Sequence, residues 1–168
     1  TLVTTGLVHV AGEVSTTAYV EIPAIVRDVV TKIGYTSSDT GFDGDSCGVS
    51  VSIGAQSSDI AAGVDRAMEQ REHRSNDPLD EQGAGDQGIM FGFACDETPD
   101  LMPATLYYSH KILEKMAADR HSGAASFLEP DAKSQVTLRF ENGKPVAATA
   151  IVVSTQHAPD VSREDIRE

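Results

Sequence analysis

This chain contains few cysteines, few basic residues and no long apolar run, and each shortage excludes a class of protein. Only two of its 168 residues are cysteines, Cys47 and Cys95. Two cysteines cannot supply the disulfide framework of a small secreted domain, so we expect reduced thiols and a cytoplasmic location. Thirteen Lys and Arg oppose 26 Asp and Glu, which gives a formal net charge of −13. A field of that sign repels phosphate backbones, so we expect no nucleic-acid partner.

The lack of a long apolar run determines what we expect about a membrane partner. No stretch approaches the roughly 20 apolar residues that span a bilayer, and no basic-then-apolar signal opens the chain, so we expect no membrane partner. The composition, 40% hydrophobic and 23% charged, is that of a globular protein with one domain or two small ones. There is no initiator Met, and a helix pattern that begins at Ser162 stops within two turns. We interpret the chain as an internal fragment of a longer protein.

Apolar periodicity predicts a first unit of two strands, a helix and a third strand. Residues 2–20 are rich in Val and Thr with glycine breaks, which is typical of two strands joined by a tight turn. Apolar residues at helical spacing predict an amphipathic helix over 22–33, which Gly34 ends. A polar loop at 37–46 leads to an alternating strand at 47–53.

A second unit is predicted after residue 87. The apolar run at 88–94 predicts a strand, and helical spacing after Leu106 predicts a helix that ends near Gly123. The pair Asn142-Gly143 lies between two alternating runs, which is a strong hairpin signal. The two units together predict an α+β fold of repeated strand and helix units, with mixed sheets and helices packed on one face. The opposite sheet faces would be left for a partner.

Residues 54–87 separate the two units and contain two features with open interpretations. The stretch is rich in charge and poor in large apolar residues, which suits a disordered linker or a functional lid equally. Residues 83–88 spell the dinucleotide fingerprint G-x-G-x-x-G, but that motif needs a strand before it and a helix after it, and here the order is inverted. A glycine hinge that presents Asp86 to a ligand and a simple turn both remain possible.

Asp131 and Lys133 form the other candidate for chemistry, just before a predicted strand. Such a pair could hold a ribose hydroxyl and a phosphate, or it could be a solvated ion pair at a turn. The acidic stretch at 43–48 lacks the ligands that a calcium loop needs, and none of the histidines has zinc-site spacing. We therefore predict no metal ligands in this chain.

Five segments, in order, resemble those of the S-adenosylmethionine synthetases, also called methionine adenosyltransferases. The most specific is Gly-Ala-Gly-Asp-Gln-Gly-Ile-Met-Phe-Gly at 83–92. The resemblance implies an enzyme that joins the sulfur of L-methionine to C5′ of ATP and cleaves the released triphosphate to pyrophosphate and phosphate. It also implies Mg²⁺ and K⁺ as cofactors, and a homodimer or homotetramer with its active sites between subunits. The five segments lie at 12–17, 63–67, 83–94, 130–137 and 154–157.

The resemblance assigns roles to five residues. Glu13 and Gln56 would contact methionine. Asp86 would lie in the active site beside methionine, as a residue that takes part in catalysis. Asp131 and Lys133 would bind ATP. No metal ligand is carried over to this chain.

The resemblance also implies three similar domains, two of which are partly present here. Residues 1–62 would belong to the first domain and 84–168 to the central one, truncated at its C-terminal end, with 63–83 as a flexible loop over the active site. The family's His-Pro-Asp-Lys segment does not occur in the chain, so we expect these 168 residues alone to be inactive. The alternative is a non-catalytic α+β module that dimerises through its open sheet faces.

Overall fold

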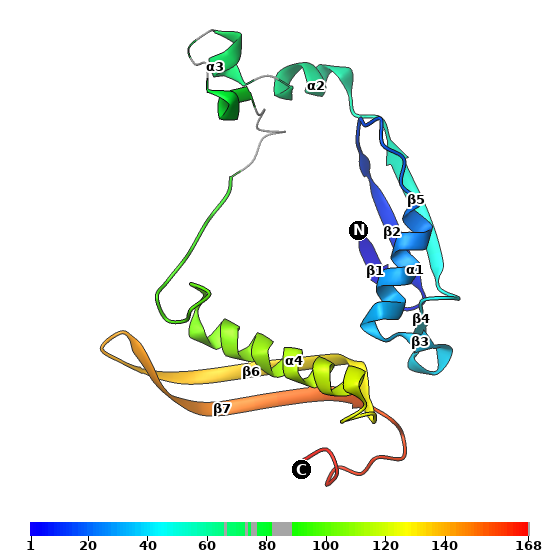
Figure 1. The fold of residues 1–168 in the computed structure, drawn as a ribbon, viewed down its shortest axis with the longest axis vertical. Coiled ribbons are helices and arrows are strands. Elements are labelled where there is room, and N and C mark those ends of the chain that lie inside the picture. Colours follow the sequence, from blue (N-terminus) through cyan, green and yellow to red (C-terminus); the bar gives the residue numbers. More distant parts are fainter. Residues whose placement is uncertain (66, 73, 75–76, 82–88, 168) are drawn as a thin grey trace. The chain divides into compact units, whose positions relative to one another are not determined.

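The computed structural model describes residues 1–65, 67–72, 74, 77–81 and 89–167. The chain divides into two compact units, Thr1–Asp28 with Asp45–Phe91 and Val29–Gly44 with Gly92–Glu168. None of the described helices is long and apolar enough to cross a membrane. The elements labelled in Figure 1, together with two short 3₁₀ helices, are β1 (Leu2–Thr4), β2 (Leu7–Glu13), α1 (Ile22–Ile33), β3 (Thr36–Ser37), η1 (Ser38–Thr40), β4 (Phe42–Asp43), β5 (Gly48–Gly54), α2 (Ser58–Val64), α3 (Met68–Arg71), η2 (Pro78–Glu81), α4 (Ala104–Ser122), β6 (Leu128–Glu141) and β7 (Lys144–His157).

The first unit contains a mixed three-stranded sheet in the order β1-β2-β5. β1 is antiparallel to β2, whereas β2 runs parallel to β5 from Leu7, beside Gly48, to Glu13, beside Gly54. Parallel neighbours need a long crossover, and the chain between them includes α1. Val8 and Cys47 are buried in this unit. The two N-terminal strands and the strand before residue 54 are therefore confirmed, and β2 ends at Glu13 rather than near residue 20.

The second unit contains the long helix α4 against the hairpin β6–β7 (Figure 1). α4 ends at Ser122 and is capped by Gly123, whose φ of 81° lies in the left-handed region that glycine adopts without strain. Asn142 and Gly143 turn the chain with φ values of 51° and 76°, and Glu141 pairs with Lys144 across the turn. The helix end and the hairpin are both confirmed, and so is the α+β class.

A small hairpin inside the predicted polar loop was not expected. β3 pairs with β4, and the Tyr35 and Phe42 rings meet edge to face with centroids 5.3 Å apart. Tyr35 N donates to the carbonyl of Val30 at 3.3 Å, and Gly44 N donates to the carbonyl of Tyr35 at 2.9 Å. These hydrogen bonds pair backbone amides and carbonyls of the loop. The polar and glycine-rich sequence of the loop does not reveal this pairing.

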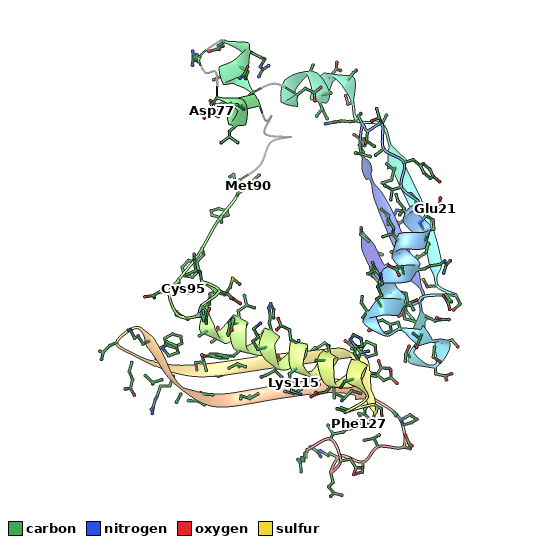
Figure 2. The ribbon with its side chains drawn as sticks, viewed as in Figure 1. Glu21, Asp77, Met90, Cys95, Lys115 and Phe127 are labelled. Carbon is green, nitrogen blue, oxygen red and sulfur yellow. The ribbon has the colours of Figure 1, made fainter. Side chains whose placement is uncertain are left out.

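The predicted strand at 88–94 is wrong for the residues that the structure describes. Residues 89–94 form no strand, and Met90, labelled in Figure 2, is 89% exposed. A strand requires a neighbour to pair its amides and carbonyls, and no described strand pairs with this stretch. A second correction concerns Asp131 and Lys133, which lie within β6 rather than before it, because β6 already pairs with β7 at Leu128.

The segment between the units contains short helical pieces in its described part. α2, α3 and η2 lie between β5 and residue 82. No side-chain hydrogen bond caps the start of α2 or of α3. The choice between linker and lid stays a prediction, and residues 83–88 lie outside the described residues.

Candidate functional site

Glu13 and Gln56 lie at the same edge of the first sheet. Glu13 is the last residue of β2 and lies beside Gly54, the last residue of β5. Val14 N donates to the carbonyl of Gly54 at 3.0 Å, which extends this pairing by one residue. Gln56 follows β5 by two residues and is half-buried, whereas Glu13 is exposed. Because the two strands are parallel, their carboxyl ends meet and bring the carboxylate and the amide to one edge.

The Glu13 carboxylate and the Gln56 amide at this edge can bind the polar groups of an amino acid. An exposed carboxylate can accept hydrogen bonds from an ammonium group, and the Gln56 amide can both donate and accept. A Cβ atom placed on Gly54 would lie 3.9 Å from Cγ of Glu13, so the glycine leaves room beside that side chain. The arrangement can bind the α-ammonium group of a small polar ligand.

Asp131 and Lys133 lie two residues apart in β6, and both are exposed. Lys133 pairs in register with Ser154 of β7. The intervening Ala132 is half-buried, and the following Ser134 reaches α4 through a hydrogen bond to the carbonyl of Ser109. Consecutive residues of a strand point to opposite faces, so Lys133 lies on the face opposite to that of Ser134, away from α4. An exposed carboxylate and an exposed ammonium are thus presented next to each other.

Asp86, the fifth predicted residue, lies outside the described residues. The described pairs each belong to one compact unit: Glu13 and Gln56 to the first, Asp131 and Lys133 to the second.

A cluster around Tyr35 was missed by the sequence analysis. Burial raises the pKa of the Tyr35 hydroxyl above its ordinary value, and the carboxylates of Asp131 and Glu129 raise that pKa further, while the guanidinium of Arg120 opposes them. The hydroxyl therefore stays protonated at neutral pH, beside the residue predicted to bind ATP. The sequence contains one signal for this cluster, which is Arg120 just before the helix end at Gly123. A cation in the last turn of a helix is attracted to free carbonyl groups.

The described residues hold no cluster of three or more His, Cys, Asp or Glu side chains that could bind a metal ion. Hence the Mg²⁺ and K⁺ that the family resemblance implies do not find a ligand set among them. Neither Cys47 nor Cys95 forms a disulfide.

Comparisons with known proteins match both units. The chain matches the family model of the S-adenosylmethionine synthetase N-terminal domain over residues 1–58 and that of the central domain over residues 81–168.

Three curated relatives are each called S-adenosylmethionine synthase. The relative from Leifsonia xyli subsp. xyli is 59% identical over 167 residues, which is 99% of this chain and 42% of the relative. The relative from Parafrankia sp. is 56% identical over 99% of this chain and 42% of its own length. The relative from Salinispora tropica is 56% identical over 100% of this chain and 43% of its own length. The chain thus spans less than half the length of these relatives.

Proposed function

We propose that this chain, which belongs to the S-adenosylmethionine synthetase family, supplies part of an active site that makes S-adenosylmethionine from ATP and L-methionine. The observation that carries the proposal is the pairing of Glu13 with Gly54, two residues before Gln56, at one sheet edge, in a chain 59% identical to a synthase over 99% of its length. The reaction is an adenosyl transfer, so the enzyme is a methionine adenosyltransferase.

The chemistry of the transfer fits the residues that the chain offers. The methionine sulfur uses a lone pair to form a bond to C5′, while the C5′–O bond breaks and its electron pair leaves with the triphosphate. A thioether is neutral and carries no proton, so no general base is required, and the residues need only align the reactants and stabilise charge. The product is a sulfonium cation, which carboxylates on the methionine side stabilise.

Glu13, Gln56 and Asp86 form the methionine side in this proposal. Glu13 binds the ammonium group, and Gln56 orients the amino acid through its amide. Asp86 takes the role nearest the reacting sulfur, where a negative charge stabilises the nascent sulfonium.

Asp131 and Lys133 form the nucleotide side. A carboxylate accepts hydrogen bonds from ribose hydroxyls, and a lysine ammonium binds phosphate oxygens as a point charge. One lysine cannot balance a triphosphate in a chain with a formal net charge of −13, so further cations must accompany that anion. We propose Mg²⁺ and K⁺ for this task. Among the described residues, no group of His, Cys, Asp and Glu side chains forms a ligand set for a metal.

Self-association is part of the proposal, as a homodimer or homotetramer with the active site between subunits. In β7 the apolar side chains of Ile151 and Val152 are 57% and 56% exposed. Consecutive strand residues point to opposite faces, so both faces of this strand keep apolar surface that a second subunit could cover. Sedimentation of the purified protein would test this, and a monomer at micromolar concentration would count against it.

Residues 63–83 are proposed as the loop that closes over the active site, in a cytoplasmic enzyme. Arg71 and Arg74 within it are exposed, so trypsin should cleave there before it cleaves in the β6–β7 hairpin. ATP together with methionine should slow that cleavage, whereas ATP alone should slow it less. Equal cleavage with and without ligands would contradict a closing loop.

The experiment that tests the function uses this chain completed with the flanking segments of the Leifsonia xyli synthase, called the completed enzyme below. Formation of S-adenosylmethionine from ATP and L-methionine is measured against the parental synthase. Activity within about tenfold of the parent supports the proposal. A completed enzyme that has the melting temperature and oligomeric state of the parent, but makes no product, would favour the non-catalytic α+β module.

A further inference from the structure

The end of α1 is tied to the end of α4 by an arginine. Arg120 Nη2 donates to the carbonyl of Ile33 at 2.7 Å, and His121 Nε2 lies 3.4 Å from the same oxygen. Ile33 is the last residue of α1, so its carbonyl has no partner further along the helix. The carbonyl end of a helix carries partial negative charge, which a guanidinium complements. Ile33 lies in the segment matched by the N-terminal family model and Arg120 in the segment matched by the central one.

Gly34 allows the two elements to approach this closely. Its φ of 118° is one that L side chains rarely adopt. A Cβ atom at this position would lie 2.1 Å from Arg120 Nη1 and 3.3 Å from Cγ of Pro130. The backbone at Gly34 is therefore in contact with the guanidinium and with the residue that precedes Asp131.

The start of β6 lies next to this contact. Leu128 pairs with His157 and Ala132 with Thr155, but the register is irregular between them, so residues 129–131 have no regular partner in β7. Two of these residues, Glu129 and Pro130, line a cavity of about 490 Å³ together with Arg120 and the last turn of α1. Glu129 and Pro130 thus lie close to α1 and Arg120 where regular pairing with β7 is interrupted.

Tyr35 completes the arrangement on the other side of Gly34. Its amide and carbonyl are bonded to Val30 and Gly44, and its ring packs against Phe42. Its hydroxyl lies in the field of Asp131, Glu129 and Arg120. Residues 33–35 are consequently fixed by these local contacts, in the same compact unit as Arg120 and Pro130.

We propose that Arg120 is a positioning residue for the nucleotide site, since it holds the end of α1 against Pro130 and so fixes the place of Asp131 and Lys133. This inference rests on the proposed function, because it takes Asp131 and Lys133 as the ATP-binding pair. Arg120 does not touch the nucleotide; it acts through the unpaired stretch at the start of β6. Its planar fork allows one nitrogen to bind Ile33 while the other faces Gly34, which a lysine cannot reproduce.

The test compares Arg120→Met with Arg120→Lys in the completed enzyme. Arg120→Met should raise the KM for ATP roughly threefold to tenfold while the KM for methionine stays within about twofold. Arg120→Lys should recover part of the loss because it keeps the charge. Amide hydrogen exchange at 129–133 should become faster in Arg120→Met than in the unchanged enzyme. A role confined to stability would lower the amount of active enzyme and leave both KM values unchanged, and that result would overturn the proposal.

Two matched variants serve as controls. Lys115→Met removes another cation of α4, one that pairs with Asp119 and whose side chain is 72% exposed (Lys115 is labelled in Figure 2). Gly34→Ala disrupts the same contact from the other side and keeps Arg120 in the sequence, and Gly123→Ala places a Cβ on another positive-φ glycine where no atom lies within 4 Å. We expect Gly34→Ala to raise the KM for ATP and both Lys115→Met and Gly123→Ala to leave it unchanged.

The outcomes separate this inference from the function on which it rests. If the completed enzyme makes no S-adenosylmethionine, the proposed function fails, and with it the nucleotide role of Asp131. If the enzyme is active but Arg120→Met and Gly34→Ala bind ATP as the unchanged enzyme does, only the positioning role of Arg120 fails.

Discussion

The hydroxyl of Ser134 in β6 donates a hydrogen bond of 2.6 Å to the main-chain carbonyl of Ser109 in α4. The bond is partly buried and joins the helix to the strand that carries Lys133. Since Ser109 O lies within a helix, the serine hydroxyl adds a second donor to a carbonyl that helical bonding already uses. It therefore sets the distance between helix and strand at one defined point.

Loss of this bond should weaken the second unit measurably. Ser134→Ala in the completed enzyme should lower the free energy of unfolding by about 0.5–1.5 kcal/mol, the net value of one hydrogen bond. Thr149→Ala is the control, because its hydroxyl bond to the carbonyl of Thr137 is exposed and 3.3 Å long. Urea unfolding measures both. An equal effect of the two substitutions would show that the bond to Ser109 is not a significant link.

The hairpin turn offers a test of backbone strain alone. Gly143 has a φ of 76°, and nothing lies within 4 Å of a Cβ placed there. Gly143→Ala should therefore cost about 1–2 kcal/mol through conformation rather than through a clash. Gly143→Asn should cost less, since asparagine tolerates the left-handed region. Thermal unfolding of both variants checks the order, which a steric cause would not produce.

Glu13 should determine methionine affinity more than nucleotide affinity. Glu13→Gln keeps the shape of the side chain but removes its charge, so the completed enzyme should lose a charge-assisted bond to the ammonium group. The expected cost is about 1.5–3 kcal/mol, or roughly tenfold or more in the KM for methionine, with the KM for ATP changed much less. Glu141→Gln is the control, since Glu141 forms only an exposed ion pair with Arg139. Equal changes in both KM values would argue against the assigned role.

Asp86→Asn should impair catalysis far more than folding. The substitution removes one negative charge beside the proposed sulfonium, which should cost roughly 1.5–3 kcal/mol, or about 10- to 150-fold in rate or affinity. The melting temperature should stay within the error of its measurement. A lower melting temperature with normal turnover per folded molecule would show that Asp86 has a structural role and not a catalytic one.

Ser162 and Asp165 form a reciprocal pair whose ionisation can be followed directly. Bonds from the hydroxyl and the amide of Ser162 hold the pKa of Asp165 below its ordinary value of 3.8. The carboxylate form makes these bonds, so their contribution is present above pH 3.8 and is lost as the pH falls through the lowered pKa. Ser162→Ala removes the hydroxyl, and NMR titration should then find the pKa of Asp165 closer to 3.8. An unchanged pKa would contradict the pairing.

Features that depend on neighbours in the sequence were predicted well. The helix end at Gly123 and the turn at Asn142-Gly143 both require a left-handed backbone that few residues adopt. The strand that was predicted at 88–94 failed for the opposite reason. Its apolar residues suit a strand, but strand formation depends on a partner, and no described strand pairs with residues 89–94.

For the candidate site too, the sequence predicted some features and the tertiary structure decided the others. The resemblance of short segments identified Glu13, Gln56, Asp131 and Lys133, but their spacing in the sequence says nothing about which of them meet. The parallel pairing of β2 with β5 brings Glu13 next to Gly54. Glu129 and Pro130 lie close to α1 and Arg120, a proximity that no local pattern contains.

The sequence by itself determined the family, the helices α1 and α4, the hairpin turn and the acidic character of the chain. These follow from local conformational preference, from periodicity and from composition. Only the tertiary structure decided that Arg120 binds the carbonyl of Ile33, 87 residues earlier in the chain. The physical reason is that a guanidinium can serve any exposed carbonyl within its reach, and only the packed positions of α1 and α4 select one of them.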